Sequence, residues 1–309
     1  MFELTFLGTA ATMPSAERGL QALLVGADSD RYLVDCGEGT QRQMLRAGSG
    51  FRRLRHVLLT HAHLDHVLGL AGLISTLRLL DLRDELTICG SGQTVAFVRR
   101  LLASLWGEGR APVPLRLVPL EPGPVLDRRD YRIACFPVRH SITDSLGYRF
   151  DTLPRRHLRA ELLATYGIPA GPLRARLAAG EAIHLPDGRH VTPEMVEGPL
   201  QPGASLAIVG DTEEVETLAD LVRGVDALVI EATFLERDVV LARERNHLTA
   251  AGAGRLAAAA GVGALYLQHI SGRYDAAEVA AEAARFFPNV RVMSDFDRVQ
   301  VTARSRAAI

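Results

Sequence analysis

The sequence predicts an α/β protein, and three observations lead to that expectation. Short apolar runs typical of buried strands alternate with longer segments typical of helices along most of the 309 residues. Several of the apolar runs end at a histidine or an aspartate, so these residues recur at one kind of position. Hydrophobic residues make up 48% of the chain and the mean hydropathy is +0.09, so the chain can form a sizeable core.

The first part of the chain is expected to contain four strands and two helices. Strands are predicted at 2–7, 20–25 and 31–35. A glycine-rich turn, Asp35–Gln43, leads into a short helix that ends near Arg46. The apolar run Val57–Leu59 predicts a fourth strand, and the proline-free apolar segment Val67–Leu82 predicts a helix.

The stretch between that strand and that helix contains three histidines and one aspartate, namely His61, His63, Asp65 and His66. Imidazole and carboxylate groups suit zinc, manganese or iron, and a strand-to-helix turn can hold them convergently. Because alternate residues point to opposite sides, we expect His61 and His63 to share one metal ion while Asp65 and His66 face another. The stretch therefore predicts two metal ions, about 3.5–4 Å apart as in bridged hydrolytic sites, and each ion needs further ligands.

Later strand ends offer those ligands. Strands are expected at 85–89, 115–119, 131–138, 205–209, 226–230, 264–268 and in the region that ends near 302, with helices near 93–105, 215–223, 249–260 and 275–286. His140, Asp211 and His269 each follow one of these strands closely. An aspartate that opens a loop is most often a helix N-cap. A carboxylate can also bridge two cations and reduce their mutual repulsion, and we favour this use for Asp211.

Two further residues can supply a proton donor. Glu231 follows the strand at 226–230, and His247 stands just before the helix at 249–260. A buried Glu–His pair would orient one imidazole as a proton donor. We predict such a pair here.

Residues 152–203 differ in composition from the rest of the chain. Between Arg149 and Gly180 six arginines stand against two acidic residues, a net charge of +4. Frequent proline and glycine residues between short helical segments predict a protruding arm without a second core. A solvated surface insertion is the alternative. The arginines singled out in it are Arg155, Arg156, Arg159, Arg174 and Arg176.

Composition limits the remaining possibilities. All 35 basic residues are arginine, as a genome rich in G and C would produce, and the formal net charge is −1, so a polyanion site must be a local patch. The sequence contains no run of eighteen apolar residues, so it predicts no membrane span. Met1–Thr5 lacks the basic region of a signal peptide. Cys36, Cys89 and Cys135 are widely spaced and are expected to be reduced core thiols of a cytosolic protein.

Motifs along essentially the whole chain carry a family resemblance. They are Phe6–Thr9, Asp35–Gln43, the His61–His66 motif with His140, Asp211 and His269, then Gly147–Arg149, Gly210–Thr212, Glu231–Phe234, His247–Thr249 and His269–Tyr274. The chain resembles the ribonuclease Z (tRNase Z) family within the metallo-β-lactamase superfamily. Departures from the family pattern at Gly19, Ala71 and Leu248 remove no predicted ligand.

The resemblance implies a fold and a cofactor. The fold is the four-layer αβ/βα sandwich of two mixed sheets, a single domain over 1–309 with a tRNA-binding arm inserted at about 152–203. The cofactor is two zinc ions per subunit, with manganese or iron(II) as alternatives. One ion would be held by His61, His63 and His140, the other by Asp65, His66 and His269, and Asp211 would bridge them.

The resemblance also implies an activity. A cytoplasmic homodimer would cleave precursor tRNA on the 3′ side of the discriminator nucleotide, leaving a 3′-hydroxyl on the tRNA and a 5′-phosphate on the trailer. Asp65 would accept a proton from water, and His247, oriented by Glu231, would protonate the leaving group. Ser271, Arg273 and the arginines of the arm are expected substrate contacts.

Two alternatives to this activity belong to other classes. A hydrolase of a small ester, lactone or cyclic phosphodiester needs the same ligands but no arm. A non-catalytic RNA-binding protein with structural zinc is disfavoured by seven ligands without thiolate, because structural zinc sites are closed and often thiolate-rich.

Overall fold

The computed structural model describes residues 1–82, 84–141, 143–213 and 216–304. The chain divides into two compact units, one formed by Met1–Thr152 with Ala204–Ile309 and one formed by Leu153–Gly203. None of the helices in the described ranges is both long enough and apolar enough to cross a membrane.

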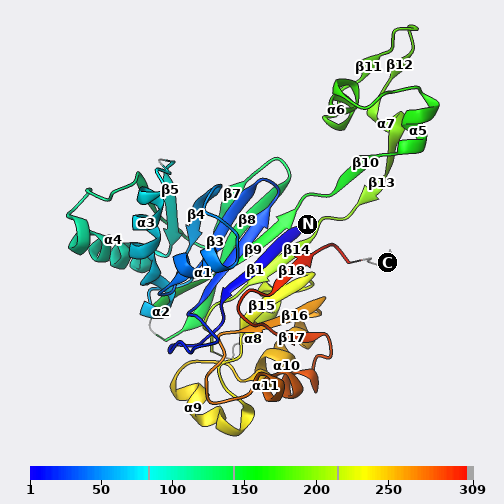
Figure 1. The fold of residues 1–309 in the computed structure, drawn as a ribbon. Coiled ribbons are helices and arrows are strands. Elements are labelled where there is room, and N and C mark those ends of the chain that lie inside the picture. Colours follow the sequence, from blue (N-terminus) through cyan, green and yellow to red (C-terminus); the bar gives the residue numbers. More distant parts are fainter. Residues whose placement is uncertain (83, 142, 214–215, 305–309) are drawn as a thin grey trace. The chain divides into compact units, whose positions relative to one another are not determined.

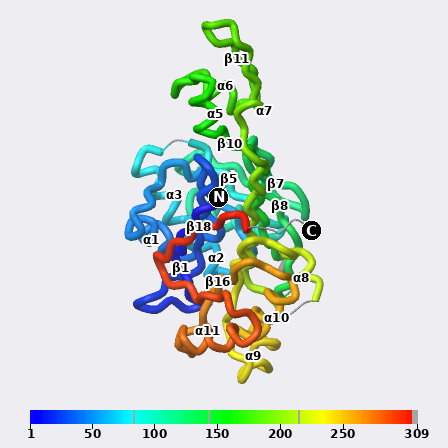
Figure 2. The backbone as a smooth tube through the Cα atoms, turned by 90° about the vertical axis from the view of Figure 1, so that its right-hand side faces the viewer, coloured from blue at the N-terminus to red at the C-terminus, as the bar shows by residue number. Residues whose placement is uncertain are grey.

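Two seven-stranded mixed sheets form the centre of the first unit (Figure 1). The first sheet, in spatial order, contains β18 (Arg298–Val301), β1 (Phe2–Gly8), β2 (Ala22–Ala27), β3 (Asp30–Val34), β4 (Leu54–Leu58), β5 (Leu86–Gly90) and β6 (Leu115–Pro119). The second contains β17 (Val290–Val292), β16 (Ala264–Gln268), β15 (Ala227–Glu231), β14 (Ser205–Ile208), β9 (Thr143–Thr152), β8 (Tyr131–His140) and β7 (Gly123–Asp127). The first and last strands of the chain, β1 and β18, pair side by side (Figure 2).

In each sheet one half is antiparallel and the other half is parallel. The parallel runs are β3–β4–β5–β6 and β14–β15–β16–β17. Because neighbouring parallel strands end at the same edge of a sheet, residues that follow β3 and β4, or β14, β15 and β16, are brought close together. The predicted ligands stand largely at these positions.

Helices cover the outer face of each sheet, so the first unit has four layers. α1 (Thr40–Arg46), α3 (Gly69–Leu79) and α4 (Gly92–Trp106) pack on the first sheet. α8 (Glu216–Leu221), α9 (Val239–Glu244), α10 (Ala250–Ala260) and α11 (Ala276–Ala284) pack on the second, and α2 (Leu64–Val67) and η1 (Glu236–Asp238) are single turns. Alternate residues of a strand fill the cores on the two faces of its sheet. Leu33 packs towards the helices, whereas Tyr32 and Val34 pack between the sheets. The predicted four-layer sandwich is confirmed.

Most predicted elements lie within a few residues of their observed bounds, and the differences are as follows. The expected helix at 67–82 begins earlier and is divided into α2 and α3. The strands β7 and β9 and the helix α9 were not expected. In β9, a Cβ on Gly147 would lie 2.3 Å from the Phe136 ring, so this glycine marks close packing. The first residue of the helix expected at 215–223 lies outside the described residues.

The second unit contains two strand pairs and three short helices. β10 (Arg155–Leu158) pairs with β13 (Glu197–Gln201), and β11 (Ile183–His184) pairs with β12 (His190–Val191). The helices are α5 (Ala160–Thr165), α6 (Pro172–Ala178) and α7 (Pro193–Val196). Seven buried side chains form a core of their own: Leu163, Ile168, Leu177, Ile183, Leu185, Val191 and Val196. The expectation that this segment lacks a core is therefore wrong.

The charge of the second unit also differs from that of the window chosen in the sequence. Over residues 153–203 six arginines stand against five acidic residues, a net charge of +1. Three acidic residues after Gly180 lie close to arginines of the unit: Glu181, Asp187 and Glu197 are 3.0, 2.7 and 3.9 Å from Arg176, Arg189 and Arg156. The unit is nearly neutral, and any polyanion surface on it must be local.

Candidate metal centre

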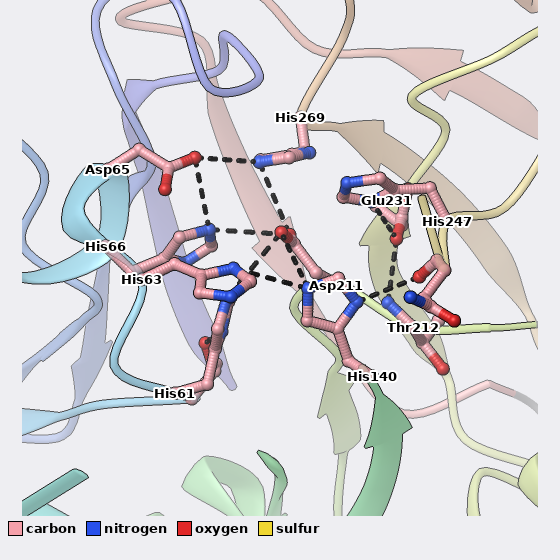
Figure 3. A network of polar contacts seen from close by, with 12 residues as sticks. His61, His63, Asp65, His66, His140, Asp211, Thr212, Glu231, His247 and His269 are labelled. Atoms are coloured by element: carbon pink, nitrogen blue, oxygen red, sulfur yellow. Dashed lines mark hydrogen bonds and ion pairs between the residues drawn. The ribbon is translucent and has the colours of Figure 1, made fainter. Parts of the chain in front are cut away.

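The seven predicted ligands converge where strands of both sheets end (Figure 3). His61 and His63 follow β4, Asp65 and His66 lie in α2, His140 ends β8, Asp211 follows β14 and His269 follows β16. All are buried except His63, which is half-buried. Residues separated by more than 200 positions in the sequence thus share one site.

The ligand atoms form two groups that share Asp211. One group is His61, His63, His140 and Asp211, and the other is Asp65, His66, His269 and Asp211; within each group the atoms lie within 4.8 Å of one another. The Oδ2 atom of Asp211 is 3.7 Å from His61 Nε2 and 3.8 Å from His140 Nε2. Its Oδ1 atom is 3.4 Å from His66 Nε2 and 3.3 Å from His269 Nε2. Each oxygen of this carboxylate therefore faces a different group.

The backbone gives this division a different cause from the one expected. His63 is extended, with φ −65° and ψ 148°, and His61 and His63, two positions apart, belong to the same ligand group, as predicted for an extended chain. Asp65 and His66 are neighbours in the first turn of α2, where successive side chains diverge by about 100°. The change from extended chain to helix, and not continued alternation, separates the two pairs.

The glycine-rich turn after β3 holds the ligand-bearing turn in place. The Cys36 N–H group donates to the His66 carbonyl at 2.7 Å, and the Gly69 N–H group donates to the Cys36 carbonyl at 2.9 Å. A Cβ on Gly37 would lie 2.4 Å from the Asp65 carbonyl oxygen, and one on Gly69 would lie 2.0 Å from the Gly37 carbonyl oxygen. Only glycine allows these backbones to approach so closely, which gives the turn a structural role in the site.

Four imidazoles are anchored through Nδ1, which leaves Nε2 towards the shared carboxylate. The Nδ1 contacts are His61 to Thr60 Oγ1 (3.0 Å), His66 to Asp35 Oδ2 (2.8 Å), His140 to the Asn246 carbonyl (2.8 Å) and His269 to Thr233 Oγ1 (2.9 Å). Hydrogen bonds of this kind orient metal-binding histidines and fix their tautomers. His63 presents Nδ1 instead, 3.3 Å from His140 Nε2.

The electrostatics of the centre favour bound cations. His61 Nε2, His66 Nε2 and Asp211 Oδ1 are buried and lack a hydrogen-bond partner among the described residues. Burial would raise the pKa of Asp211, but His269 and His66 hold it well below its usual value. Burial, with His66 next, lowers the pKa of His61 well below its usual value. A buried carboxylate surrounded by unpartnered imidazole nitrogens fits divalent metal ions.

Glu231 and His247, which were predicted to pair, are in contact. His247 Nδ1 is 2.9 Å from Glu231 Oε1, and this oxygen also accepts from the Thr212 N–H group at 2.7 Å. Burial lowers the pKa of His247, but Glu231 outweighs it and raises that pKa to about 9. The His247 ring lies 5.1 Å from the His140 ring, between centroids, so it stands beside the ligand groups.

Glu231, His247 and His269 could in principle form a third metal-binding group, since one ligand atom of each lies within 4.8 Å of the others. Both oxygens of Glu231 are already occupied, however, Oε1 by Thr212 and His247 and Oε2 by the Thr233 hydroxyl at 2.5 Å. We therefore interpret Glu231 and His247 as a hydrogen-bonded pair.

The expected substrate contacts lie in two places. Ser271 and Arg273 follow His269, the first half-buried and the second exposed. The five arginines belong to the second unit, where Arg155, Arg156, Arg159 and Arg176 are exposed. Arg174 is partly buried and donates to the Ile168 carbonyl at 2.7 and 3.0 Å, so its role within the unit is structural.

Sequence reasoning missed the residues that contact the Nδ1 atoms of the ligand histidines, namely Asp35, Thr60 and Thr233. One feature could have identified Asp35, because it directly follows a strand, as His269 does. Both residues have left-handed backbones, with φ 59° at Asp35 and φ 57° at His269. Such conformations in non-glycine residues are uncommon and often occur at functional sites.

A four-layer αβ/βα sandwich with two histidine–aspartate groups that share one carboxylate and could hold divalent metal defines a metallo-β-lactamase-fold protein. In fold it is similar to the metallo-beta-lactamase fold protein YhfI from Bacillus subtilis (TM-score 0.70, 17% identity, 96% of this chain and 98% of that one). It is also similar to human tRNase Z, short form (TM-score 0.68, 22% identity, 97% and 100%).

Sequence comparison gives the family. A family model described as anti-Pycsar protein Apyc1 matches residues 2–99. A curated ribonuclease Z from Bradyrhizobium diazoefficiens is 55% identical over 301 residues, which cover 97% of this chain and 100% of that protein. The chain belongs to the ribonuclease Z family.

Proposed function

We propose that this protein is a metal-dependent endoribonuclease that cleaves precursor tRNA on the 3′ side of the discriminator nucleotide. The products are a tRNA with a 3′-hydroxyl and a trailer with a 5′-phosphate. The observation that carries the proposal is the Asp211 carboxylate divided between two groups of imidazoles, in a chain of the ribonuclease Z family. We propose zinc, two ions per subunit, because imidazole-rich sites suit it; manganese and iron(II) share these ligands.

The chain's own residues have distinct roles around the metal ions. Divalent ions at the two groups would activate water and neutralise charge on the phosphoryl oxygens. Asp65 has one oxygen 3.4 Å from His269 Nε2, and its carboxylate can accept the proton of the attacking water. His247 donates a proton from Nε2 to the leaving 3′ oxygen while Glu231 holds its Nδ1–H group. A proton donor of this kind contributes roughly 10²–10⁴-fold.

We also propose that the second unit binds tRNA. Its own core makes it an independently packed element, and Arg155, Arg156 and Arg159 are exposed on or next to β10. Arg156 and Arg159 face acidic partners at 3.9 and 3.6 Å, and exposed pairs of this kind are weak, so phosphate can displace them. Arginine forks suit phosphate oxygens.

Replacing Arg155, Arg156, Arg159 and Arg176 with serine should weaken tRNA binding and make it less dependent on salt. The logarithmic salt slope should decrease by about 0.7–0.9 for each phosphate that an arginine no longer neutralises. Binding is measured by filter retention between low and moderate salt. Lysine at the same four positions keeps the charge and is the matched control, with a slope close to that of the unaltered protein. An identical slope in the serine variant would contradict a tRNA-binding role for these residues.

Removal of the second unit separates the proposed function from a small-molecule hydrolase. Its ends are adjacent, because the Thr152 N–H group donates to the Ala204 carbonyl at 2.8 Å, and a short linker can join them. The three cores of the first unit are built from residues outside 153–203. Deletion should preserve hydrolysis of a small nitrophenyl phosphodiester while strongly reducing cleavage of precursor tRNA. Equal retention of both activities would contradict the proposal.

We propose a cytoplasmic homodimer as the working form. All three cysteines are free and buried, which suits a reducing compartment. Leu64 and Leu68 are four positions apart on one helical face beside the metal centre and are 54% and 37% exposed. Such apolar exposure supports a surface that a second subunit covers. Light scattering should give twice the 33.5 kDa mass of one chain, and a monomeric mass would contradict the dimer.

A further inference from the structure

The hydroxyl of Thr60 lies between a buried carboxylate and a ligand imidazole. Thr60 Oγ1 is 2.9 and 3.1 Å from the two oxygens of Asp35 and 3.0 Å from His61 Nδ1. Asp35 also accepts from the Thr60 N–H group at 2.8 Å, and His66 Nδ1 lies 2.8 Å from its Oδ2 atom. One carboxylate thus contacts one ligand directly and a second ligand through a threonine.

The same arrangement occurs at the edge of the second sheet. Thr233 Oγ1 is 2.5 Å from Glu231 Oε2 and 2.9 Å from His269 Nδ1. The hydroxyl also lies 3.1 Å from the His269 carbonyl and 3.5 Å from His247 Nδ1, both longer contacts. Glu231 in turn contacts His247 directly at 2.9 Å. Each buried carboxylate therefore serves two imidazoles, one of them through a hydroxyl.

The direction of these hydrogen bonds follows from counting protons. A threonine hydroxyl has one proton to donate, and an ionised carboxylate can only accept. The hydroxyls of Thr60 and Thr233 therefore donate to Asp35 and Glu231, and only their lone pairs remain for the imidazoles. His61 and His269 must then carry their protons on Nδ1, which leaves Nε2 unprotonated and able to bind a metal ion.

We propose that Thr60 and Thr233 are positioning residues that fix the tautomers of His61 and His269, one in each ligand group. Each carboxylate sets the tautomer of a histidine that it does not touch, by directing the hydroxyl proton. The inference rests on the metal assignment of the proposed function. Thr60→Val and Thr233→Val keep the side-chain shape but lose the acceptor, so each should weaken metal binding by about 10–100-fold.

The test combines zinc affinity with the tautomers of the two histidines. Affinity for Zn²⁺ alone is measured by competition with a chromophoric chelator, and tautomers are read from ¹⁵N-histidine NMR spectra of the zinc-free protein. In the unaltered protein, His61 and His269 should be protonated on Nδ1. The valine variants should lose this preference only at the adjacent histidine. Thr60→Ser and Thr233→Ser keep the hydroxyl and should restore both the tautomer and the affinity.

Two further variants sharpen the result. Asp35→Asn places an amide donor beside Thr60, so the hydroxyl can turn and donate to His61, which should then carry its proton on Nε2. Thr94→Val removes a buried hydroxyl that contacts Ser91, at 3.0 Å, and no imidazole among the described residues; it should change neither readout.

Unchanged tautomers and affinity in the valine variants would overturn the proposal, as would a serine variant that binds zinc as weakly as its valine counterpart. If Thr60→Val fails to fold, the His61 tautomer in the Asp35→Asn variant still decides. Failure of the unaltered protein to bind any divalent metal would instead overturn the metal assignment, and the NMR tautomers distinguish the two failures.

Discussion

Asp211→Ala is expected to release metal from both ligand groups and to abolish cleavage. Its two oxygens face different groups, at 3.4 Å from His66 Nε2 and 3.7 Å from His61 Nε2, so one substitution removes a ligand from each. Without the carboxylate, two cations a few ångströms apart would also repel each other unscreened. The rate should fall by more than the roughly 10²–10⁴-fold that a proton donor contributes. Elemental analysis and single-turnover cleavage measure the two effects together.

Asp226→Asn is the matched control for this substitution. Asp226 is also buried, but it accepts from the Ser205 N–H group at 2.7 Å and from the Arg304 N–H group at 3.0 Å, and it belongs to neither ligand group. This variant should retain both metal ions. An active Asp211→Ala protein that carries two full equivalents of metal would show that Asp211 is not the bridge.

His247→Ala is expected to retain metal and tRNA affinity while slowing cleavage by roughly 10²–10⁴-fold. The ligand groups are complete without His247, and its Nδ1 is held by Glu231 at 2.9 Å. The defect should largely disappear on a substrate with a nitrophenolate leaving group, because that group departs without a proton. His56→Ala, at a histidine in β4 outside the ligand groups, is the control. Equal slowing on both substrates would rule out a general-acid role, and loss of metal would make His247 a ligand.

The pH dependence of cleavage should report the protonation of His247. Glu231 raises the pKa of His247 to about 9 against the opposing effect of burial, so the proton donor is present below that pH and is lost above it. Cleavage of precursor tRNA should therefore fall as pH rises through about 9. Glu231→Gln removes the interaction that raises the pKa, and the alkaline limb should move to lower pH. A limb that does not move in this variant would contradict the pairing.

This pairing also makes stability depend on pH. The folded-state pKa of His247 is raised above 6.5, so the folded protein holds a proton that the unfolded chain releases. The contribution is fully present below pH 6.5 and is lost as pH rises to about 9. Thermal unfolding of the unaltered protein and of Glu231→Gln across this range measures it.

The ligands could be predicted from the sequence because their chemistry is local and unusual. Three histidines and one aspartate between His61 and His66 are hard to explain without a metal, and His140, Asp211 and His269 repeat the same relation to a preceding strand. Asp35 also directly follows a strand and could have been found in this way, whereas Thr60 and Thr233 could not. Threonine after a strand is common, and its value here depends on which carboxylate and which imidazole the fold places on either side.

Much of the structure of the second unit could not be predicted from the sequence. Its composition distinguished residues 152–203 from the rest of the chain, yet its core and its two strand pairs were missed. The core residues Leu163, Leu177 and Val191 are spread over short elements, none long enough to show a periodic pattern. Its charge was overstated because the acidic residues that approach Arg156 and Arg176 come later in the sequence.

Cleavage of end-labelled precursor tRNA by the purified protein, mapped to one nucleotide, is the decisive experiment for the proposed activity. We predict a single cut on the 3′ side of the discriminator nucleotide, with a 3′-hydroxyl on the tRNA and a 5′-phosphate on the trailer. Chelation should abolish the cut, and added zinc should restore it. Cuts scattered along the RNA, no cut in a protein that carries both metals, or a cut that persists without metal would contradict the proposed function.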